Sequence, residues 1–150
     1  MSPKSSKKSR TSKPYKRVLV MLGVRKPNKN VIDEAVRLSD QLGAKLCAIQ
    51  INLPGAGKPT MMMEPLPRIQ EKDVRDAFRR HGHKDVAKEM GVRIDEGASL
   101  AQVIRRETKR ADLLVIGHKQ RNRLLAALRV ASIDKQLVDL SDCPLVVVPA

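Results

Sequence analysis

A glycine and a group of basic and hydroxyl side chains follow a short apolar run near the C-terminus, and their types suit anion binding. Residues 113–116 are all apolar, and Gly117 ends the run. Glycine lets backbone N–H groups approach a phosphate, and basic side chains add positive charge around it. A solvated basic loop would contain the same residue types, so both interpretations stay open. The candidate nucleotide- or anion-binding residues are Gly117, His118, Lys119, Gln120, Arg121, Arg123, Ala131 and Ser132.

Three other motifs contain residue types that bind ligands or catalyse reactions, but they lack the required partners. Gly55–Lys58 (GAGK) has neither the first glycine of a P-loop nor the hydroxyl residue that follows its lysine. His81 and His83 are two residues apart, so on one helix they would point away from each other. His118 and Ser132 do not make a full set of nucleophile, base and orienting group. We therefore expect no metal site and no enzymatic activity.

The formal net charge is +14, and about half of it belongs to the N-terminal segment. Residues 1–16 are rich in serine and lysine and have little to bury, so we expect a disordered basic tail ahead of one α/β domain at residues 17–150. Such a tail favours polyanions such as RNA, DNA, a ribosome or an anionic membrane surface; the alternative is a solubilising extension. The candidate nucleic-acid-binding residues are Lys4, Lys7, Lys8, Arg10, Lys13, Lys16 and Arg17.

Composition limits the remaining classes of function. Tyr15 and Phe78 are the only aromatic residues, so the core must be aliphatic and few side chains can stack on nucleic-acid bases. No apolar run is long enough to cross a membrane, and no apolar segment of a secretory signal follows the basic N-terminus. Cys47 and Cys143 are expected in strands as buried free thiols, which favours a reducing cytoplasm.

Apolar runs and helical periodicity alternate along the chain. Strands are predicted at residues 18–24, 46–51, 92–95, 113–116 and 145–148, the third of them at a sheet edge. The runs without alternation indicate strands buried on both faces. The pattern predicts an α/β, Rossmann-like fold: an open five-stranded parallel sheet with helices on both faces.

Helices are predicted between these strands. One begins near Asn28 or Asn30, with Asn30 and Asp33 as a capping box, and ends at Gly43. A second spans residues 69–90, and a third follows a capping box at residues 99–102.

The C-terminal residues resemble the universal stress protein family. ADLLVIG at 111–117 matches its fourth strand, Ala131-Ser132 takes the place of its Gly-Ser, and CPLVVVP at 143–149 matches its ending. The element order is similar from about residue 17 to 150. The resemblance implies the strand order 3-2-1-4-5, dimers formed through the last strand, and ATP bound with its phosphates over the loop after the fourth strand.

The sequence departs from the family's ATP-binding pattern, Gly-x2-Gly-x9-Gly-[Ser/Thr]. Gln120 replaces the second glycine, and Ala131 stands in place of the third, one residue late. Leu22 or Gly23 occupies the position at which the family has an aspartate at the end of the first strand. The resemblance therefore implies a degenerate nucleotide site, with ATP or a related nucleotide as its ligand if it has one.

Two functions are expected from these observations. The first is a cytoplasmic regulatory or binding module in stress response, a homodimer in which Val147 and Val148 lie on an edge strand that needs covering. The alternative is a nucleic-acid- or ribosome-associated stress protein. It would bind phosphate backbones without reading sequence. The contacts would come from the tail and from Arg105, Arg106, Lys109, Arg110, Arg121 and Arg123.

Overall fold

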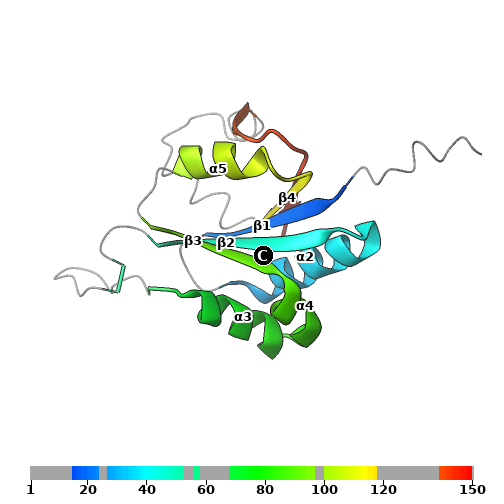
Figure 1. Cartoon of the computed structure of the whole chain (residues 1–150), viewed down its shortest axis with the longest axis vertical. Helices are drawn as coiled ribbons and strands as arrows, with labels where there is room; N and C mark the ends of the chain where they lie inside the picture. The colour runs from blue at the N-terminus through cyan, green and yellow to red at the C-terminus, as the bar shows by residue number, and fades with distance from the viewer. Residues whose placement is uncertain are drawn as a thin grey trace, which may run out of the picture.

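The protein alternates strands and helices along the chain. The computed structural model describes residues 15–23, 27–52, 56–57, 68–96, 100–117 and 139–149. Residues 1–14 of the predicted tail and residue 99, the first of the predicted capping box at 99–102, therefore lie outside the described residues. The elements are β1 (Arg17–Gly23), α2 (Lys29–Leu42), β2 (Lys45–Asn52), α3 (Glu71–Arg80), α4 (Lys84–Glu89), β3 (Gly91–Glu96), α5 (Leu100–Thr108), β4 (Leu113–Gly117) and β5 (Leu145–Val148) (Figure 1). None of the described helices is both long and apolar enough to span a membrane.

The five described strands form one parallel sheet in the order β3-β2-β1-β4-β5. Helices α2, α3 and α4 cover one face of the sheet and α5 covers the other (Figure 1). The predicted fold class and strand order are therefore confirmed.

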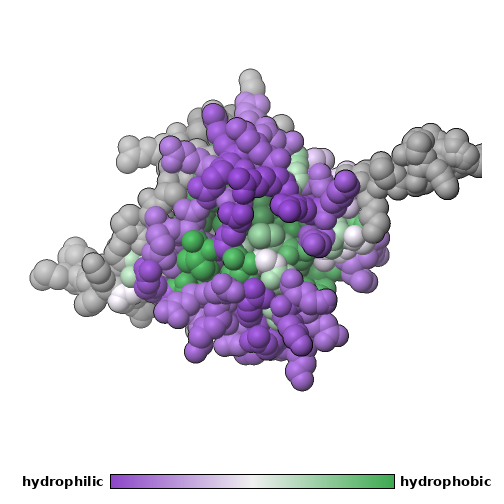
Figure 2. Space-filling view, in the orientation of Figure 1, coloured by the Kyte–Doolittle hydropathy of each residue, from purple (hydrophilic) through white to green (hydrophobic). Residues whose placement is uncertain are grey.

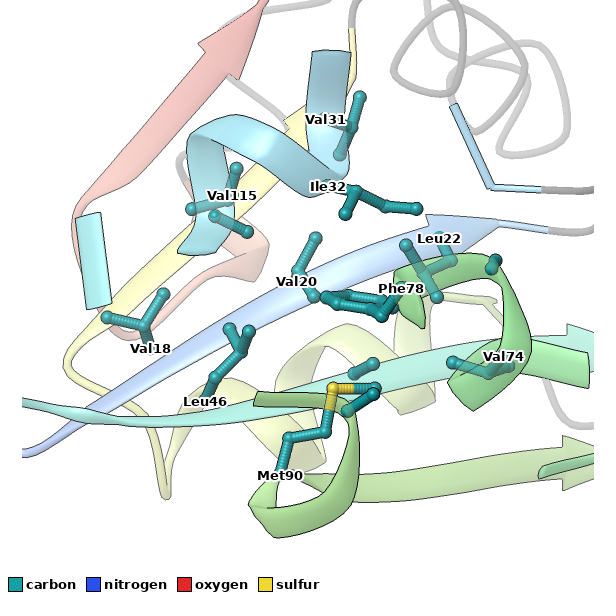
Figure 3. Packing of buried hydrophobic residues seen from close by; sticks show 14 of the residues in the cluster. Val18, Val20, Leu22, Val31, Ile32, Leu46, Val74, Phe78, Met90 and Val115 are labelled. Atoms are coloured by element: carbon teal, nitrogen blue, oxygen red, sulfur yellow. The ribbon is translucent and has the colours of Figure 1, made fainter. Parts of the chain in front are cut away.

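Strand β1 lies at the centre of the sheet and is buried on both faces. Val20 lies on the face covered by α2, α3 and α4, in a cluster with Phe78 of α3 (Figure 3). The next residue, Met21, lies on the opposite face in a second cluster with Ile104 of α5. Because both faces are covered, the strand needs apolar residues at every position, which explains its unbroken apolar sequence.

The edge strand β3 carries charged side chains that disfavour pairing with another strand. β3 pairs with β2 on one side, and it alternates the half-buried Val92 and Ile94 with charged residues. Figure 2 shows hydrophilic residues over α5 and over α3 and α4, with a hydrophobic band between them along this edge. Arg93, Asp95 and Glu96 place charges on the strand, as natural edge strands do to prevent unwanted pairing.

Helix α2 begins at the first of its two predicted starts, Asn28, but without the predicted capping box. Asn28 is the N-cap, and its side-chain oxygen accepts a hydrogen bond from the Asn30 backbone N–H at 2.8 Å. The predicted Asn30–Asp33 capping box is wrong, because the Asp33 carboxylate instead contacts Lys29 and His83. The predicted end of the helix is confirmed: Gly43 has a φ of 62°, in the left-handed region that glycine adopts readily.

The single helix predicted at residues 69–90 is two helices, α3 and α4. Gly82, with a φ of 88°, breaks the helical path between them. The break places His83 against α2, where its Nε2 lies 2.7 Å from Asp33 Oδ1. Arg75 of α3 closes the pair of helices by donating to the carbonyl oxygens of Ala87 at 2.6 Å and Met90 at 3.0 Å.

Asp112 joins the amino ends of β1 and β4. One of its carboxylate oxygens accepts hydrogen bonds from the backbone N–H groups of Lys16 at 2.7 Å and Arg17 at 2.9 Å. Its own backbone N–H donates to the Arg17 carbonyl at 2.9 Å. The aspartate of the ADLLVIG motif is therefore a structural residue that aligns two neighbouring strands.

Replacing Asp112 with alanine should destabilise the fold by about 2 kcal/mol, because two backbone donors lose a charged acceptor. Asp112→Asn keeps one acceptor oxygen and should lose less. Urea unfolding measures both changes. Asp142→Asn is the control, since Asp142 is exposed and no hydrogen bond or ion pair of its carboxylate is found among the described residues. Equal stability of Asp112→Ala and the wild type would show that the carboxylate does not hold β1 in place.

Candidate nucleotide and anion site

The candidate site lies at the carboxyl edge of the sheet, between β1 and β4. The chain crosses from β1 to β2 on one side of the sheet, and β4 pairs with β1 on the other. Ligands of open parallel α/β sheets bind at such a switch point. Gly117 ends β4 there, buried and in register with Val148 of β5. The other predicted site residues lie outside the described residues: His118, Lys119, Gln120, Arg121, Arg123, Ala131 and Ser132.

The residues that end β1 bring no charged side chain to the candidate site. Leu22 is fully buried in the apolar cluster beneath α2 and α3. Gly23 has a φ of 81° and ends the strand at an irregularity in its pairing with β2. Neither residue presents a carboxylate to a ribose or a base, which agrees with the departure seen in the sequence.

Two buried amides on β2 shape the same edge, and the sequence analysis did not identify them. Gln50 and Asn52 are 0% and 2% exposed. The Gln50 side-chain nitrogen donates to the Gly23 carbonyl oxygen at 2.7 Å and so fixes the last residue of β1. The available signal was the presence of two amides in an otherwise apolar strand, residues 46–52 (LCAIQIN).

Asn52 is the centre of a polar network that anchors the start of α3. Its side chain accepts from the Ile69 N–H at 2.9 Å and donates to the Ile69 carbonyl at 2.8 Å. It also donates to Glu96 Oε2 at 3.1 Å, and Glu96 Oε1 pairs with Arg68 at 2.8 Å. The hydrogen bond from Asn52, and then the Arg68 guanidinium, hold the pKa of the Glu96 carboxyl below its usual value.

This arrangement can position a ligand but shows no reactive group. Glu96 is bonded to both Asn52 and Arg68, and the Gln50 and Asn52 amides donate to backbone carbonyls, so these side chains act as scaffold for the edge. Among the described residues, no three histidine, cysteine, aspartate or glutamate side chains gather closely enough to hold a metal ion. Gly117 and the basic residues that follow it in the sequence remain the predicted phosphate contacts.

Two residues of the second set of predicted binding residues lie at the opposite end of the strands, at the amino edge. Lys16 and Arg17 are exposed at the start of β1, and the other tail candidates (Lys4, Lys7, Lys8, Arg10 and Lys13) are not among the described residues. Arg106, which was predicted to contact phosphates, instead pairs with Asp95 and Glu107. No ion pair within the described ranges involves Arg105, Lys109 or Arg110, and all three are exposed.

Strand β5 is the outermost strand on the side of the sheet opposite β3. Val147 is 37% exposed, whereas Val148 is buried. A groove of about 410 Å³ runs between β5 and α2, lined on the helix by Asp33, Glu34 and Arg37.

The two cysteines were expected as buried thiols inside strands. Cys143 lies just before β5 rather than inside a strand, and both it and Cys47 in β2 are half-buried free thiols.

Comparisons with known proteins agree with this architecture. The family model described as "Universal stress protein family" matches residues 14–149. One similar solved structure is a universal stress protein in complex with cAMP, with 18% identity and a TM-score of 0.60 over 90% of this chain and 97% of that one. A family protein from Burkholderia pseudomallei has 21% identity and a TM-score of 0.51, over 91% and 98% of the two chains.

A third structure, the universal stress protein of Archaeoglobus fulgidus in complex with dAMP, has 14% identity and a TM-score of 0.50 over 89% and 98% of the two chains. At these identities the likeness shows a shared fold. No curated protein gives a significant match.

The lowered pKa of Glu96 predicts a pH-dependent stability. A carboxyl whose pKa is lower in the folded state stabilises the fold above its unfolded-state pKa, and this contribution is lost as the pH falls through the folded-state pKa. Glu96→Gln should therefore be less stable than the wild type at neutral pH, and the difference should shrink on acidification. Urea unfolding at a series of pH values measures it. A difference that stays constant down to strongly acidic pH would contradict the assigned role of this carboxylate.

Proposed function

The chain belongs to the universal stress protein family, and on that premise we propose that it is a regulatory binding module of a stress response with a nucleotide as its ligand. The observation that carries the proposal is the position of Gly117. It ends β4 beside β1 at the switch point of the sheet, and a basic loop follows it in the sequence. The complexes of related proteins with cAMP and dAMP support a nucleotide as the ligand class.

The residue types at the site favour recognition of phosphate over recognition of the ribose or base. Lys119, Arg121 and Arg123 can supply positive charge, and Ser132 can supply a hydroxyl. Gln120 and Ala131 add side chains where glycines would let the backbone approach, so phosphate contacts must come more from side chains than in a glycine-rich loop. With no carboxylate at the end of β1, we propose that affinity rises with the number of phosphates.

This proposal predicts that gently purified protein carries a nucleotide, detected by mass spectrometry, and that ATP raises its melting temperature more than AMP does. Lys119→Ala and Ser132→Ala should each weaken ATP binding, the lysine variant by about tenfold or more, because a charge-assisted contact is worth at least 1.4 kcal/mol. Lys88→Ala, which removes an exposed charge from α4, is the control.

The same experiment tests the absence of enzymatic activity. We propose that the module binds without turnover, because His118 is the one histidine in the loop and has no evident orienting partner in the sequence. ATP incubated with the protein should remain intact. Steady hydrolysis that disappears in His118→Asn would instead make the protein an enzyme, and failure of any nucleotide to bind would remove the nucleotide from the proposal.

We further propose that the module is a homodimer through β5. This strand is an edge of the sheet, it carries the exposed Val147, and the groove beside it presents both acidic and basic side chains of α2. An unpaired edge with an exposed apolar residue is stabilised by pairing with a second copy.

Val147→Arg should therefore convert a dimer into a monomer at micromolar concentration, because it places a charge in the centre of the apolar contact. Sedimentation velocity measures the change. Gln102→Arg, at an exposed position of α5, adds the same charge elsewhere and should leave the dimer intact. A wild-type protein that sediments as a monomer at this concentration would rule out the dimer.

A second candidate function, binding to nucleic acid, is favoured by one observation. Arg105, Lys109 and Arg110 form an exposed basic surface at the end of α5 without compensating ion pairs in the part of the chain that the structure describes. Uncompensated basic residues bind phosphate backbones without reading sequence, and the basic residues of the tail precede β1. This function is compatible with the first because it uses the opposite edge of the sheet.

A further inference from the structure

Three arginines from three separate parts of the chain line one small hollow on the α5 face of the sheet. Arg17 begins β1, Arg93 lies in β3, and Arg110 follows the end of α5. The hollow has a volume of about 40 Å³, and its lining also includes Cys47 and Glu107. It lies toward the amino edge, away from the switch point at Gly117.

The charged residues that line the hollow affect the pKa of the Cys47 thiol within it. Burial raises the pKa of the Cys47 thiol; the positive charge of Arg93 opposes that rise, the Glu107 carboxylate adds to it, and the positive charge of Arg17 also opposes it. The Glu107 carboxylate, which is 4% exposed, is already engaged by Arg106 at 2.9 Å and Arg93 at 3.5 Å. Among the described residues it forms no ion pair with Arg17 or Arg110.

Arg17 and Arg110 are left without a counter-ion at the rim. Both are exposed, and neither takes part in an ion pair within the described ranges. The carboxylate of Asp112 lies at the same edge but is occupied by two backbone N–H groups. Like charges held together repel one another, so an anion placed between them is stabilised by each.

We propose that Arg17, Arg93 and Arg110 form a binding site for a phosphate group of a nucleic-acid backbone. Guanidinium groups donate paired hydrogen bonds that match the oxygens of a phosphate. Since a cavity needs about 10–15 Å³ to hold one water, the hollow has room for a phosphate and not for a nucleoside. The site rests on the second candidate function and gives it a defined contact.

The surroundings favour a flexible nucleic-acid strand over a membrane. Lys16 directly precedes Arg17, and Arg105 and Lys109 continue the basic surface along α5. A recess that admits one phosphate at a time suits a chain of separate phosphates better than a flat surface of headgroups. Because the chain has only two aromatic residues, the contact is to the backbone and not to stacked bases.

The test uses the full-length protein and a fluorescent single-stranded RNA of 20 nucleotides, titrated at several salt concentrations. The Arg17→Gln/Arg110→Gln double variant should bind severalfold more weakly, with a salt slope reduced by about 0.7, because the site contacts one phosphate and each lost phosphate contact removes about 0.7 from the slope. The matched control is Lys72→Gln/Arg80→Gln, which removes the same charge from exposed positions of α3. It should keep the wild-type slope.

A second readout reports on the hollow itself. In a Cys143→Ser background, Cys47 is the remaining thiol, and bound RNA should slow its alkylation by iodoacetamide. The Arg17→Gln/Arg110→Gln variant should lose that protection while keeping the wild-type melting temperature. Equal protection by inorganic phosphate at the same phosphate concentration, or by anionic vesicles, would overturn the assignment to a nucleic-acid backbone.

The outcomes separate the site from the function on which it rests. If the wild type binds no RNA at low salt, both the second candidate function and the site fail. If RNA binds but the double variant and the control behave alike, nucleic-acid binding stands and the three-arginine site is wrong. A variant with all the basic residues of 1–14 changed to glutamine should lose affinity and still protect Cys47 at higher RNA concentration.

Discussion

Strand β1 is held at each end by a side chain from a neighbouring part of the sheet: Asp112, just before β4, and Gln50 of β2. The positions of both candidate sites depend on the position of β1. Asp112 accepts the backbone N–H groups at its amino end, and Gln50 donates to the carbonyl of its last residue. Burial of residues 18–22 on two faces supplies most of the stabilisation, at about 1.5–3 kcal/mol for each large side chain, against about 1 kcal/mol for a hydrogen bond. The apolar residues hold β1 in the sheet, and the polar bonds fix where it begins and ends.

With β1 fixed in this way, the two edges of the sheet have different chemistry. Parallel strands bring all carboxyl ends to one edge, where Gly23 and Gly117 end β1 and β4 and the Gln50 amide of β2 holds the end of β1. The amino ends meet at the opposite edge, where Arg17 stands beside the end of α5. Backbone donors at one edge suit a compact phosphorylated ligand, whereas long cationic side chains at the other suit an extended anion.

The sequence predicted the central strands well, because a strand that is buried on both faces needs apolar residues at every position and therefore appears as an unbroken apolar run. It failed where a residue's partner lies far away in the chain. Asp33 was assigned to a local cap, but besides Lys29 it contacts His83, which is fifty residues away and follows the Gly82 break in the predicted helix. Gln50 and Asn52 were missed since an amide has the same identity whether it is solvated or buried. The anion-binding role of residues 118–132 stays a prediction from their types.

The opposite placement of the two sites bears on how they can influence each other. A seven-residue strand is about 20 Å long, which is more than two Debye lengths at physiological salt. The charge of a nucleotide at the carboxyl edge is therefore screened from the arginines at the amino edge. Coupling would require β1 to shift, and its two ends are hydrogen-bonded to β4 and β2. We therefore expect the two proposed ligands to bind independently, each with the same affinity whether or not the other is present.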